Sequence, residues 1–181
     1  MKKITLILLV FLFIKNDVAA QISDSTKLAD SIISAFKSKD FSQCKKLYID
    51  SSNYKELIDI MCKVMHMPEE EKSTFLDSFR LYADSAQLNY KNNFEQIINK
   101  GGKLGIDWNK IKKVNLVFDK TTQYPFAEFH INISCNDSSF ILFGTEVIHL
   151  FSGYKVLSLG TVFKGTTNTY FNSDLLHEED K

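Results

Sequence analysis

Apolar residues in the first half of the chain recur three or four positions apart. This spacing places them on one face of a helix, which then packs against the rest of the fold. Proline disfavours helix in the residue before it, so one helix must stop before Pro68 and another can start there. The pattern predicts four helices: Ser25–Ser38, a short one that begins after Asp40, Leu57–Met65, and a long one from Pro68 to Gly101.

Two of these helices carry recognisable end signals. Asp40, with a glutamine three residues later, is typical of a capping box at a helix start. Three glutamates after Pro68 suit the first turn of the long helix, and the pair Gly101-Gly102 suits its end. This helix would extend about 48 Å. Because that length exceeds what a small domain covers comfortably, we expect a bend or break near Asp84.

After Trp108 the apolar pattern changes from helical spacing to alternation. One face of each strand should be buried and the other wetter. The connections between the strands are short, so neighbouring strands must run antiparallel. Helices followed by strands predict an α+β fold, with the helices packed on one face of an antiparallel sheet of about four strands. The expected strands are Val114–Phe118, Phe129–Cys135, Phe140–Phe151 and Tyr154–Phe163.

The first twenty residues have the pattern of a signal peptide. Lys2 and Lys3 precede an apolar run, Ile4–Ile14, and small residues follow at the positions that a signal peptidase reads. Eleven residues span about 16 Å as a helix, against a hydrocarbon core of roughly 30 Å, so a membrane anchor is disfavoured. We expect cleavage before Gln21, a single domain over 21–164, a polar tail over 165–181, and a protein exported to the periplasm or secreted, with no membrane span after cleavage.

Charge and composition exclude one class of partner. Cleavage would remove three lysines and one aspartate, leaving 19 basic and 21 acidic residues, and Arg80 is the only arginine in the chain. A nucleic-acid-binding protein normally presents a basic face that is rich in arginine. We therefore expect no nucleic acid partner. The partner would be a small molecule or a protein of the cell envelope.

The three cysteines leave two alternatives open. An oxidising compartment permits one disulfide, and Cys44–Cys62 is the easier pair by sequence separation. Cys44, Cys62 and Cys135 could equally be buried thiols that pack as small apolar groups.

Three short stretches resemble a known superfamily. These are Ala35–Phe41, which looks like the link between the first two helices, Gly105–Trp108 before a strand, and Gly153–Val156, a turn followed by a strand. They resemble the cystatin-like, or nuclear-transport-factor-2-like, cone fold, and the second is similar to a segment of exported proteins of Bacteroidota. The resemblance implies a helix-covered cone that hosts enzymes, carriers and adaptors alike, so it does not decide function.

The resemblance also implies a place to look for catalysis. Relatives similar to ketosteroid isomerases or dehydratases use a carboxylate or a His/Asp pair on the concave face of the sheet. The polar strand residues that could serve here are Glu128, His130, Glu146 and His149. Glu128 and His130 alternate with apolar residues, so the pattern favours a solvent-facing position for both if the helices cover the apolar face.

A soft-metal site is a further hypothesis. Thioether, thiolate and imidazole ligands suit copper. Residues four apart share a helix face, which pairs Met61 with Met65 and Cys62 with His66. Methionine at helical spacing more often fills a core.

Aromatic residues give a last set of candidates. Trp108, Tyr90 and Tyr82 could stack on a ligand, although a single tryptophan where helix meets sheet usually fills the core. Taken together, the sequence favours an exported, non-enzymatic binding domain with no cofactor, acting through its sheet or the mouth of its cone. An isomerase- or dehydratase-type enzyme and a copper-binding protein are the alternatives.

Overall fold

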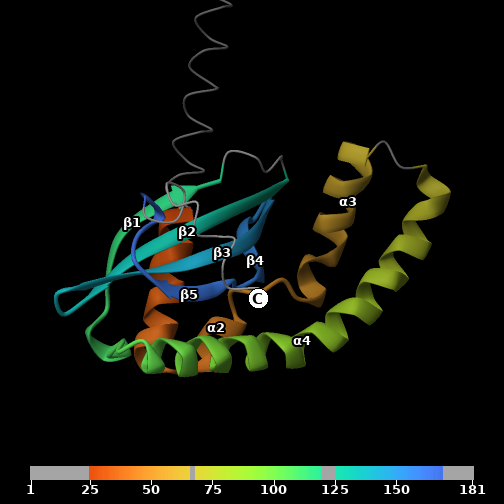
Figure 1. The fold of residues 1–181 in the computed structure, drawn as a ribbon. Coiled ribbons are helices and arrows are strands. Elements are labelled where there is room, and N and C mark those ends of the chain that lie inside the picture. Colours follow the sequence, from red (N-terminus) through yellow and green to blue (C-terminus); the bar gives the residue numbers. More distant parts are fainter. Residues whose placement is uncertain (1–24, 66–67, 120–124, 169–181) are drawn as a thin grey trace, which may run out of the picture.

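Helices and one antiparallel sheet build the protein in the computed structural model, which describes residues 25–65, 68–119 and 125–168 (Figure 1). The expected signal peptide and most of the expected polar tail lie outside these residues. Within them, no helix combines the length and the apolar character that crossing a bilayer requires.

The four predicted helices are present. The first covers residues 25–38. The aspartate cap is confirmed, because Asp40 Oδ1 accepts a hydrogen bond from the Ser42 N–H at 2.8 Å. The full capping box does not form, since the Gln43 side chain donates to Asp40 Oδ2 at 3.3 Å instead of reaching the backbone. The others are α2 (Phe41–Lys45), α3 (Tyr54–Met65) and, after a short 3-10 turn η2 (Glu69–Glu71), α4 (Lys72–Lys103).

Helix α4 is continuous for 32 residues and bends rather than breaks (Figure 1). Its last residue, Lys103, lies one position beyond the glycine pair. Gly101 faces the core: a Cβ there would lie 2.2 Å from Trp108 Cζ2, so only glycine lets the indole pack against the helix. Gly105 takes the left-handed conformation after the helix, with φ of 87°.

The sheet is a meander in the order β1-β2-β3-β4, and β5 pairs with the same edge of β3 as β4. The predicted strand over Tyr154–Phe163 is therefore two strands, separated at Leu159 and Gly160. A Cβ on Gly160 would lie 1.6 Å from the Phe143 carbonyl oxygen, so the chain passes β3 at a distance only glycine allows. The strands are β1 (Lys112–Phe118), β2 (Phe126–Cys135), β3 (Ser138–Leu150), β4 (Gly153–Ser158) and β5 (Thr161–Lys164).

The main core lies between the sheet and two helices, the first helix and the C-terminal half of α4. The Phe36 ring stacks on Phe94 of α4 at 4.8 Å and on Trp108 at 5.0 Å between ring centroids. From the sheet side, alternate β2 residues enter this core: Phe129, Ile131, Ile133 and Cys135. The predicted α+β class, with helices on one face of the sheet, is confirmed.

A smaller apolar cluster fixes α3, which stands with the start of α4 beside the sheet in Figure 1. Leu57 and Ile60 of α3 pack with Ile148 and Leu150 of β3. Glu56 of the same helix accepts hydrogen bonds from the backbone and hydroxyl of Ser152, at 2.7 and 2.8 Å, and so holds the β3–β4 turn.

The three cysteines are free thiols in the structure. Among the described residues Cys44, Cys62 and Cys135 form no disulfide, and all three are buried. The pairing of Cys44 with Cys62 is therefore wrong. Burial raises the pKa of the Cys44 thiol to about 12, so it packs as a neutral group.

Candidate functional site

A bulge in β3 shapes the surroundings of His130. Phe129 and Ile131 of β2 pair with Thr145 and Leu142 of β3, so one residue on β2 faces two on β3. Such a bulge needs one residue in an unusual backbone conformation, and Gly144 supplies it with φ of 73°. The Gly144 N–H is turned toward the histidine and donates to His130 Nδ1 at 3.0 Å.

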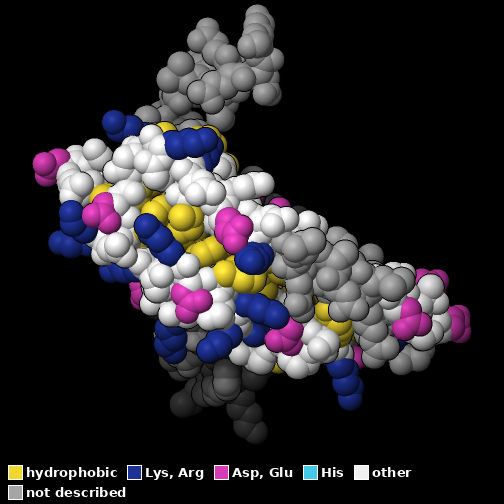
Figure 2. Space-filling view, turned by 90° about the horizontal axis from the view of Figure 1, so that it is seen from below, with side chains coloured by type: hydrophobic (Ala, Val, Ile, Leu, Met, Phe, Trp, Pro, Cys, Tyr) yellow, Lys and Arg dark blue, Asp and Glu magenta, His cyan; other side chains and the backbone are white. Residues whose placement is uncertain are grey.

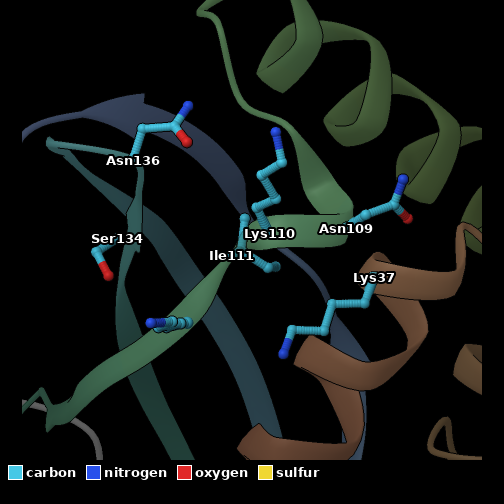
Figure 3. Close-up of a pocket in the computed structure, with 7 residues that line it drawn as sticks. Lys37, Asn109, Lys110, Ile111, Ser134 and Asn136 are labelled. Atoms are coloured by element: carbon cyan, nitrogen blue, oxygen red, sulfur yellow. The ribbon is translucent and has the colours of Figure 1, made fainter.

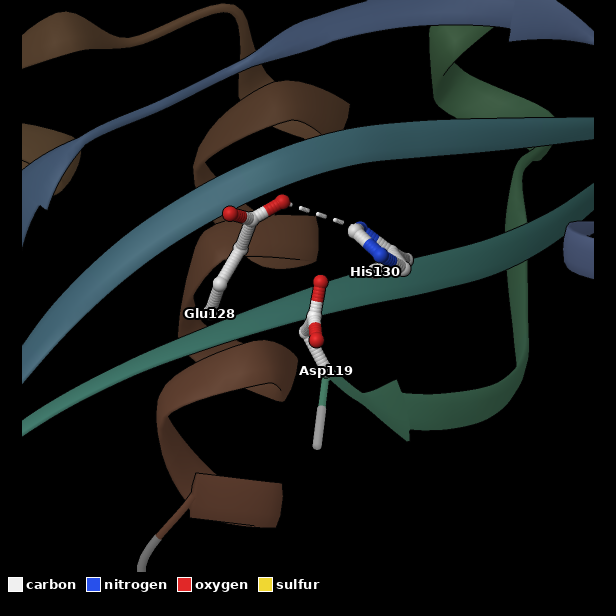
Figure 4. A group of neighbouring side chains, drawn as sticks. All are labelled: Asp119, Glu128 and His130. Carbon is white, nitrogen blue, oxygen red and sulfur yellow. Dashed lines mark ion pairs between the residues drawn. The ribbon is translucent and has the colours of Figure 1, made fainter. Parts of the chain in front are cut away.

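Carboxylates gather next to this histidine (Figure 4). Ligand atoms of Asp119, Glu128 and His130 all lie within 4.8 Å of one another, and Glu128 Oε1 is 3.8 Å from His130 Nδ1. Glu146 is the cross-strand partner of Glu128. Burial raises the pKa of Glu128, and the negative charges of Asp119 and Glu146 raise it further.

His130 does not face solvent, contrary to the expectation from alternation. Its side chain is 0% exposed, whereas that of Glu128 is 24% exposed. The face of the sheet away from the helices is itself covered at this point. The Phe143 ring lies parallel to the imidazole at 4.2 Å, and the neighbouring Asn132 exchanges hydrogen bonds of 3.0 Å with Thr167, from the chain after β5.

The geometry decides which chemistry this cluster can support. A backbone N–H can only donate, so His130 Nδ1 must be the acceptor and the neutral ring carries its proton on the other nitrogen. Burial lowers the pKa of His130, which keeps the ring neutral. Metal ligation through Nδ1 would break the bond to Gly144. Glu128, partly exposed and with a raised pKa, is the member best suited to give or take a proton.

The other two predicted catalytic residues are arranged differently. Glu146 is exposed and accepts a hydrogen bond from the Ser158 hydroxyl at 3.0 Å. His149 lies further along β3, where its ring packs on Tyr154 at 4.6 Å between centroids. The sheet thus brings Glu128, His130 and Glu146 together and leaves His149 apart.

A separate pocket opens where the first helix meets the start of the sheet (Figure 3). Its volume is about 430 Å³. Lys37 extends from the first helix toward β1, and Lys110 extends from η3 (Trp108–Lys110), the 3-10 turn before β1. We call this site the lysine pocket, and its lining residues are Lys37, Asn109, Lys110, Ile111, Lys112, Ser134 and Asn136.

The aromatic candidates belong largely to the packing of the helices. Trp108 is 1% exposed and its indole N–H donates to the Ile98 carbonyl at 3.0 Å, so it fills the core. Tyr90 stacks on Tyr48 with centroids 3.9 Å apart, beside an apolar groove of about 260 Å³ between α2 and α4. Figure 2 shows apolar surface among charged side chains on this side of the molecule. The side chain of Tyr82 lies outside the described residues.

The copper hypothesis is only partly covered by the described residues. Met61 packs against the smaller apolar cluster and Cys62 is buried. The side chain of Met65 and all of His66 lie outside the described part. The convergence of these four side chains stays a prediction.

Comparison with known proteins identifies the fold. No family model and no curated protein matches the sequence. Among solved structures, the chain is similar to a cystatin-like protein from Ruminococcus gnavus ATCC 29149, with a TM-score of 0.55 and 13% sequence identity. The match covers 84% of this chain and 47% of that protein, so the chain spans about half of its length. At this identity the likeness shows a cystatin-like fold and nothing further.

Sequence reasoning missed two parts of these sites. Asp119 directly follows the predicted strand that ends at Phe118, so its place at a strand end was a usable signal. The lysine pocket had none, because Lys37 and Lys112 are 75 positions apart in the sequence. Only the packing of the first helix against the start of β1 brings them to one pocket.

Proposed function

We propose that the chain is an exported, non-enzymatic binding domain that holds a small polar ligand in the lysine pocket. One observation carries the proposal: polar side chains line a helix–sheet pocket without being used by the fold. The side chains of Asn109, Ser134 and Asn136 form no hydrogen bond with any described residue. The volume of the pocket falls in the range of small-molecule sites, about 300 to 1,000 Å³, in which a few polar groups fix the orientation of the ligand.

The apolar groove between α2 and α4 is the weaker binding site. Its two tyrosine rings already stack on each other, and Tyr48 is 1% exposed. A ligand would have to displace this packing, whereas the amides and the hydroxyl of the lysine pocket are available without rearrangement. The groove is also smaller, at about 260 Å³ against 430 Å³.

Native mass spectrometry of protein recovered from the periplasm tests the proposal. We expect extra mass that disappears on denaturation, and a denatured chain that begins at Gln21. The variant Asn109→Tyr fills the pocket and tests whether the ligand is bound there. The native Asn109 side chain is exposed and makes no hydrogen bond within the described fold, so its replacement should not disturb folding. The variant should lose the extra mass while keeping its melting temperature. A bare native chain, or a ligand that Asn109→Tyr retains, would contradict the proposal.

A second candidate function, acid–base catalysis of the isomerase or dehydratase type, has one observation in its favour. Glu128 is partly exposed, and burial with two neighbouring carboxylates raises its pKa. Raised carboxyl pKa values are common among catalytic acids and bases. If this candidate is right, Glu128→Gln stays folded but no longer turns over a substrate that the native chain converts. An activity that survives this substitution would rule it out.

A further inference from the structure

Positive charge is concentrated around the lysine pocket. Three of its seven lining residues are lysines, from the first helix, from η3 and from β1, and none is a carboxylate. One carboxylate, Asp107, lies beside Lys110, which lowers its pKa; Lys39 lowers it to a smaller extent. The chain as a whole has no excess of positive charge, so this concentration is local.

The fold leaves most of this charge without a partner. Lys110 Nζ is 3.1 Å from Asp107 Oδ2, but Lys37 and Lys112 form no ion pair with any described residue. Lys113, the next residue along β1, does pair with Asp30 of the first helix. Adjacent lysines of β1 therefore differ, because Lys113 is paired by the first helix and Lys112 is not.

Neutral donors accompany the lysines. The amides of Asn109 and Asn136 and the hydroxyl of Ser134 can each donate a hydrogen bond. Ile111 is the one apolar lining residue, and it is fully buried in the core. A ligand there would meet cations and neutral hydrogen-bond donors.

We infer that the ligand of the lysine pocket is a small polar molecule that carries a phosphate or sulfate ester, which deepens the proposed function and rests on it. Lysine acts as a compact point charge with rotatable donors, which suits an anion with several oxygens pointing in different directions. A planar carboxylate is matched best by the fork of an arginine, and no arginine lines this pocket. The volume of about 430 Å³ leaves room for the rest of a molecule beyond the ester group.

Calorimetric titration of the whole mature chain tests the charge requirement. The probes share one scaffold: glucose 6-phosphate, glucose 6-sulfate, glucuronate and glucose. The two esters should bind at least about tenfold more tightly than glucose, and glucuronate should bind more weakly than the esters but more tightly than glucose. The affinity for the esters should fall as the salt concentration is raised. Equal affinity for glucose and for the esters would overturn the inference.

Two double variants locate the binding. Lys37→Gln with Lys112→Gln removes the two unpaired charges of the pocket and should weaken the esters at least about tenfold. Lys63→Gln with Lys164→Gln removes two exposed lysines elsewhere and should leave the affinity unchanged. An equal loss in both variants would mean that overall charge, and not the pocket, attracts the ester.

Two further outcomes separate this inference from the proposed function. If a neutral compound binds and Asn109→Tyr blocks it, the pocket holds a ligand but the ester requirement is wrong. If none of the four probes binds, the ester inference fails, and the native mass spectrum of the periplasmic protein decides the proposed function separately. Vesicles of phosphatidylglycerol, compared with glycerol 1-phosphate, show whether the ester belongs to a lipid headgroup or to a soluble molecule, and we expect the soluble ester to bind.

Discussion

Glu128 is the residue whose ionisation should be visible in the stability of the fold. Its pKa is raised in the folded chain by burial and by Asp119 and Glu146, and returns to its ordinary value on unfolding. Between the two values the folded state holds more protons than the unfolded state, so stability falls as pH rises through that window. We expect Glu128→Gln to remove this fall in stability with pH, so that the variant is more stable than the native chain at pH 7. The measurement is the free energy of unfolding in denaturant at a series of pH values.

A double-mutant cycle isolates the cause. Glu146→Gln removes one of the charges that raise the pKa of Glu128, so it should flatten the same pH dependence in part. In the Glu128→Gln background, Glu146→Gln should no longer change the slope of the free energy of unfolding against pH. A slope that Glu128→Gln leaves unaltered would show that the clustered carboxylates do not interact as the structure places them.

At this scale the sequence predicts which residues meet but not how they are buried. Alternation along β2 correctly puts Glu128 and His130 on the same face. Burial of His130 depends on Phe143, which stacks on it, and on the chain near Thr167, which covers the neighbouring Asn132. Both contacts join residues that are far apart in the sequence, so no local pattern contains them.

Among the elements, β3 and its bulge control how the last strands pair. The additional residue at Gly144 bends the ladder, and the chain opposite crosses close to β3 at Gly160. A Cβ in that position would overlap the Phe143 carbonyl. Overpacking typically costs about 1–3 kcal/mol, and a clash with backbone lies at the upper end. We expect Gly160→Ala to lower the free energy of unfolding by about 3 kcal/mol, measured in urea.

Gly102→Ala is the matched control for this prediction. Gly102 has open space around its Cβ position and lies inside α4, where alanine is the better helix former. It should leave stability unchanged or raise it. If Gly160→Ala were as stable as the native chain, β3 and the last strands could not approach each other as closely as described.

The elements themselves follow from the sequence to a large extent. Helical spacing locates the first helix, α3 and α4, and alternation locates β1, β2 and β3, because each pattern reports which face is buried. The division of the last strand between β4 and β5 is not predictable in this way. The division lies opposite the bulge at Gly144 in the partner strand, and within Tyr154–Phe163 the only turn-type residue at this point is Gly160.

Across the whole molecule, the fold brings separate segments to one pocket. Lys37 lies in the last turn of the first helix, Lys110 ends η3, Lys112 begins β1, and Asn136 lies in the β2–β3 turn. The cystatin-like arrangement places these segments together because the first helix packs across the sheet. The sequence predicts the helix and the strands, but not that their lysines share a pocket, since that depends on the angle and register of packing.

The most direct test of the account is to map ligand binding on the mature chain by amide chemical-shift changes in NMR, with glucose 6-phosphate as the probe. The account predicts saturable shifts that concentrate at residues 37, 109–112 and 134–136, with Asn109→Tyr abolishing them. Shifts concentrated around Tyr48 and Tyr90, or around Glu128, would contradict it by placing the binding site elsewhere, and the absence of any saturable shift would contradict the ester-binding pocket itself.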